Sequence, residues 1–142
     1  MLVAPSLRKA ALAMYRLCYG LTGGAIGGSS GGVPILLLTT TGRRTGKPRT
    51  TPLYYVTDGE NIVVVASNAG RQRHPNWWLN LAENPEAEVQ VRHQKRRVKA
   101  EEAIGVERQR LWRLVVETYP GYQEFQRATT RKIPVVILRP RE

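Results

Sequence analysis

Residues 33–56 read VPILLLTTTGRRTGKPRTTPLYYV, two apolar and β-branched runs joined by a short basic turn. The first run, residues 33–41, is almost continuously apolar, which is typical of a strand buried on both faces or inside a barrel. The second run, residues 49–56, follows after a turn bounded by Gly42 and Gly46. The pattern therefore predicts a β-hairpin within a strand-rich fold.

Four later segments also have the alternation or the apolar runs of strands, and three segments have helical spacing. We expect strands at 62–67, within 86–103 as a pair joined near 94–96, and at 133–138, and helices at 6–19, 74–84 and 106–118. Asp58 and Gly59 supply the turn before the strand at 62–67. Six mostly hairpin-connected strands without βαβ alternation predict a mainly β (α+β) fold, a six-stranded barrel with peripheral helices.

The N-terminal segment has two interpretations. Residues 6–19 place Leu7, Ala10, Ala11, Met14, Leu17 and Cys18 at helical spacing. The other faces carry Arg8, Lys9 and Arg16, so this basic amphipathic helix either packs on the barrel or serves as a membrane-surface anchor or substrate lid. We assign residues 1–142 to a single domain, in which residues 1–32, the helix and a Gly-rich loop, precede the barrel.

The charge of the chain limits its partners. Lys and Arg number 22 against 11 Asp and Glu, a formal net charge of +11. Such a field attracts polyanions: nucleic acid, an anionic membrane surface, or a phosphorylated or polycarboxylate cofactor. We find no transmembrane segment or signal peptide, and a lone Cys18, a small core residue in its simplest interpretation, suits a reducing compartment. These features predict a cytoplasmic protein.

Three common catalytic motifs are incomplete. GRRTGK, residues 42–47, resembles a P-loop, but its glycines are too close, Pro48 replaces the magnesium-binding Ser or Thr, and a strand follows. Residues 27–31 match G-x-S-x-G by letters, without a strand before the serine or a helix after it. His74 and His93 lie apart from any acidic cluster, so we expect neither a metal site nor a His-based triad.

The basic turn is a candidate anion receptor. Arg43, Arg44 and Lys47 either face water or act with the amides of Thr45 and Gly46 as a receptor for phosphate and carboxylate oxygens. An aromatic ring further along the second strand would complement such a receptor, because a ring-bearing anionic cofactor needs both.

Other segments leave the choice between core and site open. Ser67 lies at the end of the strand at 62–67, where a loop begins. This loop either only connects two elements of the fold or supplies hydrogen bonds to the edge of a heterocycle. The pair Trp77 and Trp78, and the set Tyr119, Tyr122 and Phe125, either pack in the core or cover a planar ligand.

Five stretches, in order and with nearly the same spacings, resemble the deazaflavin-dependent nitroreductase family of actinobacteria. They are LLTTTGRRTGKPRTTPLYY, DGENIVVVAS, HPNWWLNLAENPEAEVQV, ERQRLW and YPGYQEFQRATTRKIPVVIL, and the resemblance runs from about Ile35 to Pro140. It implies a split β-barrel related to the flavin mononucleotide-binding barrels. It also implies hydride transfer from reduced coenzyme F420, an 8-hydroxy-5-deazaflavin with a phosphate and a γ-linked glutamate tail, to a quinone or nitro-aromatic.

The resemblance also implies site residues. The cofactor would be bound by Arg43, Arg44, Thr45, Arg49, Thr50, Thr51, Pro52, Leu53, Tyr54, Val65, Ala66, Ser67, Asn68, Asn76, Trp77, Trp78, Leu79, Asn80 and Tyr122. The substrate would meet Tyr119, Tyr122 and Phe125, and the candidate catalytic hydrogen-bond donors are Ser67, Tyr122 and Tyr54. Phe125 stands where relatives often carry Tyr, which leaves the acceptor open.

Two alternatives use the same fold without catalysis. A basic barrel can bind single-stranded nucleic acid through Arg and aromatic side chains, and a deazaflavin carrier could dock on a membrane through residues 6–19. The chain lacks the interleaved aromatic strand motif of nucleic-acid-binding barrels, so we expect no nucleic-acid partner. We expect a cytoplasmic F420-dependent oxidoreductase with a small-molecule acceptor, and peripheral contact of residues 6–19 with the cytoplasmic face of a membrane stays the alternative to packing on the barrel.

Overall fold

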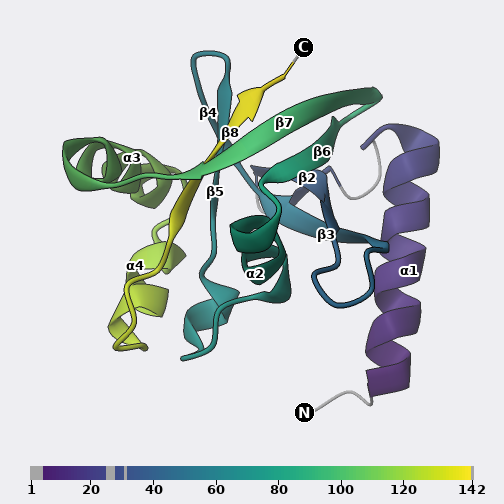
Figure 1. Ribbon diagram of the computed structural model, residues 1–142, viewed down its shortest axis with the longest axis horizontal. Coiled ribbons are helices and arrows are strands. Elements are labelled where there is room, and N and C mark those ends of the chain that lie inside the picture. The colour runs from purple at the N-terminus through teal and green to yellow at the C-terminus, as the bar shows by residue number, and fades with distance from the viewer. Residues whose placement is uncertain (1–4, 25–27, 31, 142) are drawn as a thin grey trace.

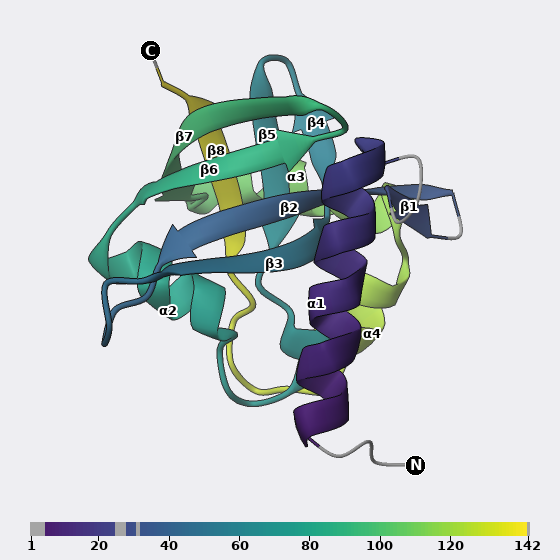
Figure 2. The ribbon, with the colours of Figure 1, turned by 90° about the vertical axis from the view of Figure 1, so that its right-hand side faces the viewer.

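The computed structural model describes residues 5–24, 28–30 and 32–141, whose strands form one curled antiparallel sheet with helices around it (Figure 1, Figure 2). The helices are α1 (Pro5–Thr22), α2 (Asn76–Glu83), α3 (Gly105–Thr118) and α4 (Gly121–Arg127), and a short 3-10 turn, η1, covers Asn68–Gly70. The strands are β1 (Ser29–Ser30), β2 (Val33–Thr41), β3 (Pro48–Tyr54), β4 (Val56–Asp58), β5 (Asn61–Val65), β6 (Glu86–Val91), β7 (Gln94–Glu102) and β8 (Val135–Pro140). Their order is β1-β2-β6-β7-β8-β5-β4, and β3 pairs with β2.

The predicted hairpin is confirmed as β2 and β3. The two strands pair from Ile35 opposite Tyr54 to Thr41 opposite Pro48, and β2 also pairs with β6. The second strand is shorter than expected, because after a last hydrogen bond from the Tyr55 amide to the Pro34 carbonyl the chain turns away from β2 and continues into β4, which pairs with β5 instead. The hairpin is therefore one wall of the curled sheet, and β4 links it to the opposite wall.

The other predicted strands correspond to β5, β6, β7 and β8, and the three predicted helices are present as α1, α2 and α3. The expected position of the β6–β7 turn is wrong. It lies at Arg92 and His93, because Arg92 adopts a left-handed backbone with φ of 57° and Gln94 already pairs with Val91. The short strands β1 and β4 were not predicted, since two or three residues carry too little pattern.

The core has two layers, one on each side of β5 and β8. Both strands are buried on both faces over most of their length, which explains their continuous apolar sequences. Val64 faces the inside of the curl, where Leu38 of β2 and Trp77 of α2 belong to the same apolar cluster. Val65 faces the other way and packs in a second cluster with Leu111 of α3. Helices α3 and α4 therefore cover the outer face of these strands.

Helix α1 is held by polar contacts of buried or half-buried side chains. Tyr19 is fully buried, and its hydroxyl lies 2.9 Å from the Ile35 carbonyl oxygen and accepts a hydrogen bond from the Arg92 amide at 3.0 Å. One turn earlier, Nη1 of Arg16 donates to the Thr50 carbonyl at 2.7 Å. These contacts attach α1 to β2, β3 and the β6–β7 turn and set the rotation of the helix.

The predicted helix at 6–19 is confirmed, and of the two interpretations of its apolar face, packing of Met14 and Leu17 on the barrel is wrong. Met14 and Leu17 are 60% and 54% exposed, and Cys18 is half-buried rather than a core residue. Arg16 and Tyr19, on the neighbouring face of the helix, bind the barrel, so Met14 and Leu17 face away from it. The side chains of Leu7 and Ala10, and residues 25–27 and 31 of the Gly-rich loop, lie outside the described part of the chain. Within the described residues, no helix combines the length and the apolar character needed to span a bilayer.

Replacing Tyr19 by phenylalanine is expected to lower the free energy of unfolding by about 1–3 kcal/mol. The ring stays in place, but the Arg92 amide loses its acceptor and the helix loses its deepest anchor. Urea unfolding followed by tryptophan fluorescence measures the effect. Leu17→Gln, on the exposed face of the same helix, is the control and should unfold like the unchanged protein. Equal midpoints for Tyr19→Phe and the control would contradict the anchoring role.

Candidate functional site

Two cavities lie next to each other along β3 and α1. The first, which we call the aromatic cavity, has a volume of about 300 Å³, and the second, the basic cavity, about 480 Å³. Residues 49–51 of β3 line the basic cavity and residues 52–54 line the aromatic one. From α1, Arg16 lines the basic cavity and Tyr15 the aromatic one. A ligand along β3 therefore meets cations at one end and aromatic rings at the other.

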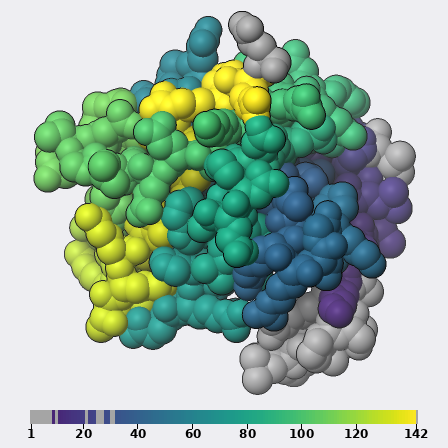
Figure 3. Space-filling view, viewed as in Figure 1, coloured from purple at the N-terminus to yellow at the C-terminus, as the bar shows by residue number. Residues whose placement is uncertain are grey.

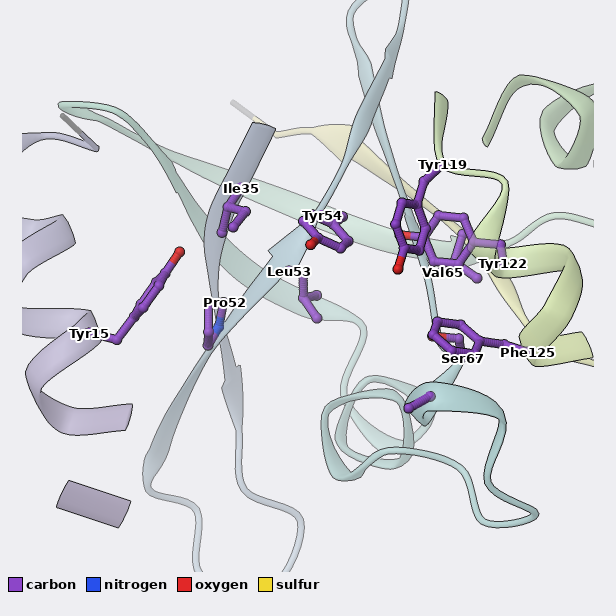
Figure 4. Close-up of a pocket in the computed structure, with 11 residues that line it drawn as sticks. Tyr15, Ile35, Pro52, Leu53, Tyr54, Val65, Ser67, Tyr119, Tyr122 and Phe125 are labelled. Carbon is purple, nitrogen blue, oxygen red and sulfur yellow. The ribbon is translucent and has the colours of Figure 1, made fainter. Parts of the chain in front are cut away.

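The aromatic cavity is lined by rings from separate elements (Figure 4). Tyr54 ends β3, Tyr119 follows α3, and Tyr122 and Phe125 lie on α4. The Tyr119 ring centroid lies 5.1 Å from that of Tyr54 and 5.0 Å from that of Tyr122, in tilted and edge-to-face arrangements. A Cβ at Gly121 would lie 2.6 Å from the Tyr119 ring, so glycine permits this close packing. The break between α3 and α4 thus places the aromatic set at one wall.

Tyr122 is the most buried of these aromatic side chains, with 6% of its surface exposed. Burial raises the pKa of its hydroxyl, and the neighbouring Tyr119 and Tyr54 act in the same direction. The phenol therefore stays protonated at neutral pH and keeps its hydrogen-bond donor.

The loop that carries Ser67 has a strained backbone held by Arg131. Asn68 and Ala69 have φ of 47° and 54°, in the left-handed region, which asparagine tolerates but alanine disfavours. Arg131 binds across this loop: Nη2 donates to the carbonyls of Ser67 at 2.8 Å and of Ala66 at 3.2 Å, and Nε to that of Arg71 at 2.9 Å. Ser67 therefore reaches the aromatic cavity from a backbone whose carbonyls are fixed by one guanidinium group.

His74 completes the Arg131 cluster. Its Nδ1 lies 3.0 Å from Nη1 of Arg131, a geometry in which the ring nitrogen accepts. Burial and the nearby guanidinium lower the pKa of His74, so the neutral ring is favoured. His74 lines neither cavity and acts as a structural partner.

The basic cavity gathers five cations. They are Lys9 and Arg16 of α1, Arg43 and Arg44 of the β2–β3 turn, and Arg49 of β3, and the described lining includes no acidic side chain. The rest of the lining is mostly polar, with Trp77 and the start of α2 at one side. The turn itself lies at the surface of the molecule beside α2 (Figure 3). Such a cavity favours an anionic ligand, because guanidinium and ammonium groups donate strong hydrogen bonds to phosphate and carboxylate oxygens.

Asn80 of α2 orients Arg43. Asn80 is only 4% exposed, and its Oδ1 accepts from the Arg43 backbone amide at 3.2 Å and from Nη1 at 2.9 Å. Its Nδ2 donates to Oγ1 of the buried Thr40 at 3.1 Å. Asn76 adds a longer contact to Nη2 of Arg43, at 3.4 Å. The partners of Arg43 are neutral amides, so its positive charge remains available to a ligand.

Of the two backbone amides expected to be available to an anion, those of Thr45 and Gly46, only the first is. The Gly46 amide donates to the Gly42 carbonyl at 2.8 Å and is not free, and Oγ1 of Thr45 accepts from the Lys47 amide. In the described part of the chain, the amides of Arg44 and Thr45 donate to no protein acceptor. The tight turn uses its own glycine amide to close, which leaves the two preceding amides for a ligand.

The structure brings most sequence-predicted site residues to one of the two cavities. The basic cavity is lined by Arg43, Arg44, Thr45, Arg49, Thr50, Thr51, Asn76, Trp77 and Asn80, and the aromatic one by Pro52, Leu53, Tyr54, Val65, Ser67, Tyr119, Tyr122 and Phe125. Ala66, Asn68, Trp78 and Leu79 line neither; Ala66 is fully buried and Trp78 packs against the inner core. All assigned roles stay predictions.

Sequence reasoning missed the contribution of α1. Lys9, Leu12 and Arg16 line the basic cavity and Tyr15 the aromatic cavity. The signal was present, since positions 9, 12 and 16 share one helical face, but both interpretations of the helix were based on the apolar face next to it. Arg131 had no local signal, because the partners of its side chain lie 57 to 65 residues earlier in the chain.

The family model for F420H(2)-dependent quinone reductases matches residues 11–140. An F420H(2)-dependent quinone reductase of Mycobacterium tuberculosis H37Rv is 40% identical over 129 residues, which cover 89% of this chain and 85% of that protein. The solved F420-H2 dependent reductase (FDR-A) is 42% identical, with a TM-score of 0.69 over 74% of this chain and 93% of that chain. A protein solved as a domain-swapped dimer is 36% identical, with a TM-score of 0.72 over 95% and 99% of the two chains.

More distant solved structures share the fold alone. One is an FAD-binding protein of Mesorhizobium loti, 16% identical with a TM-score of 0.54 over 76% of this chain and 79% of that chain. The likeness to this flavin-binding protein, a split barrel, confirms the predicted fold class.

Proposed function

The chain belongs to the F420H(2)-dependent quinone reductase family, and on this premise we propose that it uses reduced coenzyme F420 to reduce a quinone or another electron-poor acceptor. The observation that carries the proposal is the pair of adjoining cavities, one basic and without acidic side chains in its described lining, the other aromatic. Coenzyme F420 has the matching division, with a phosphate and glutamate tail at one end and a planar ring at the other.

The basic cavity would hold the anionic end of the cofactor. Arg43, Arg44 and Arg49 would donate charge-assisted hydrogen bonds to phosphate and carboxylate oxygens, and the amides of Arg44 and Thr45 would add neutral donors. The fixed position of Arg43 between two asparagines supports this role, because a preorganised guanidinium loses little freedom on binding.

The aromatic cavity would hold the ring and the acceptor. Tyr54 and Val65 would contact the ring, and Tyr119, Tyr122 and Phe125 would cover the acceptor and exclude water. Reduced coenzyme F420 supplies a hydride when it is bound. The chain would hold the two partners in close contact and place neutral donors where negative charge develops on the acceptor. The candidate donors are the hydroxyls of Tyr122, Tyr54 and Ser67.

Two measurements test the proposal. Titration with oxidised coenzyme F420, followed by its fluorescence, should show saturable binding to the purified chain. Reduced coenzyme F420 and a soluble quinone such as menadione should then react only when the chain is present, which the return of oxidised-cofactor absorbance reports. Binding without turnover across quinones and nitro-aromatics would favour the carrier alternative, and no binding would overturn the proposed function.

We also propose that α1 contacts the cytoplasmic face of an anionic membrane, where apolar quinones dissolve. Met14 and Leu17 are exposed on one face of a helix that carries no acidic residue. The same helical segment contains Arg8, Lys9 and Arg16. Exposed apolar side chains on a positively charged helix are the features of an interfacial helix.

Sedimentation with vesicles that contain anionic lipid is expected to pull down the chain, and Met14→Ser/Leu17→Ser should abolish most of that binding. The control is Ile104→Ser/Val106→Ser, which changes two exposed apolar residues near the start of α3. Equal sedimentation of the two double variants would contradict a contact through α1.

A further inference from the structure

We infer that α1 is a wall of the cofactor site and that Lys9 and Arg16 bind the anionic tail of the cofactor. The inference rests on the proposed function and adds two cations that lie outside the β2–β3 hairpin. Lys9, Leu12 and Arg16 follow one another on a single helical face, and all three line the basic cavity opposite the turn residues. Figure 2 shows α1 crossing beside β2 and β3. Helix α1 and the β2–β3 hairpin therefore form facing walls of the basic cavity.

The helix is attached firmly enough to serve as a wall. Arg16 donates to the Thr50 carbonyl at 2.7 Å, and the buried Tyr19 hydroxyl ties the next turn to β2 and the β6–β7 turn. Lys9 lies two helical turns before Arg16, about 10 Å along the axis at about 1.5 Å per residue. The two cations therefore face different parts of an extended ligand.

Within the described residues, the cations of the basic cavity have no carboxylate partners. The ion pairs of Lys and Arg in this part of the chain use Arg110, Arg127, Arg139 and Arg141. None of these four lines the basic cavity. Five cations without acidic neighbours repel one another, and an anionic ligand in the cavity removes that repulsion.

The basic cavity has a volume of about 480 Å³ and five cationic side chains. This is more positive charge than one bound phosphate group needs. The turn cations Arg43 and Arg44, with the amides beside them, form a compact receptor of the size of a phosphate. Lys9 and Arg16 lie across the cavity on a separate element and suit a second group of negative charges. In coenzyme F420 that group is the set of carboxylates of the γ-linked glutamate tail.

The test compares coenzyme F420 with its tail-less, phosphorylated form, using fluorescence titration at two salt concentrations. Lys9→Gln is expected to weaken binding of the tailed cofactor about 3- to 10-fold and to reduce its salt dependence. Binding of the tail-less form should not change. Arg113→Gln removes an exposed charge from α3 and should leave both affinities unchanged.

Arg16→Lys and Arg16→Gln separate charge from anchoring, because only the first keeps a cation. The inference predicts that the lysine variant keeps most of the preference for the tailed form and that the glutamine variant loses it. Equal affinity of Lys9→Gln and the unchanged chain for the tailed cofactor overturns the inference but leaves the proposed function standing. An equal loss for both cofactor forms also overturns it, and no binding by the unchanged chain overturns both.

Discussion

Changing Asn80 to aspartate is expected to weaken binding of coenzyme F420 about 10- to 100-fold while leaving the fold in place. Oδ1 of Asn80 accepts from the amide and from Nη1 of Arg43, so a carboxylate of the same shape pairs with this guanidinium. The second carboxylate oxygen replaces Nδ2 beside Oγ1 of Thr40, whose hydroxyl can turn to donate. The substitution therefore adds a negative charge to the wall of a cavity whose described lining is otherwise free of acidic groups.

A double variant shows whether the loss passes through Arg43. Arg43→Gln removes the same positive charge and should weaken binding by a comparable factor. If the introduced carboxylate acts by pairing with Arg43, Asn80→Asp and Arg43→Gln together bind little more weakly than either alone. Fluorescence titration gives the affinities, and Arg113→Gln on the outside of α3 controls for net charge. Additive losses would mean that Asn80 acts directly on the ligand, and an unchanged affinity would remove it from the site.

The parts of the fold that could be predicted are those encoded in short stretches of sequence. The continuous apolar runs of β2, β5 and β8 indicate strands with two covered faces, and the structure places apolar layers on both sides of β5 and β8. The basic turn between β2 and β3 was likewise visible, because glycines bound it and four cations lie in or next to it. Local pattern thus located the hairpin and one end of the site.

The rest depends on contacts between distant segments. The apolar face of α1 is compatible with packing on the barrel and with exposure, and Tyr19 decides the rotation through the carbonyl of Gln90, 71 residues away, and through the Arg92 amide. That rotation turns Arg16 and Tyr15 toward the cavities and Met14 outward. Hydrophobic periodicity cannot report a hydrogen bond to a strand that comes later, so the contribution of α1 to the site was missed.

Changing Arg131 to alanine is expected to lower the free energy of unfolding by about 2–4 kcal/mol. Its guanidinium donates to the carbonyls of Ala66, Ser67 and Arg71, and these groups lose a charged donor together. The loop also contains Ala69 in a left-handed conformation, which costs about 1–3 kcal/mol and persists only when other contacts hold it. Loss of the guanidinium therefore frees a strained loop at the edge of the aromatic cavity.

The effect should extend from stability to the site. Without the fixed carbonyl of Ser67, amides 67–73 should exchange hydrogen faster, and binding of the cofactor ring should weaken severalfold. Arg131→Lys keeps the charge but cannot donate in a fork to several carbonyls, so it should recover only part of the loss. Lys132→Ala, an exposed neighbour, is the matched control. Arg131→Ala could instead unfold at the same urea concentration as this control and protect the same amides from exchange. The loop would then hold its shape without the guanidinium, and the close packing of Gly70 against Phe125 and Ala128 would be the better explanation of its conformation.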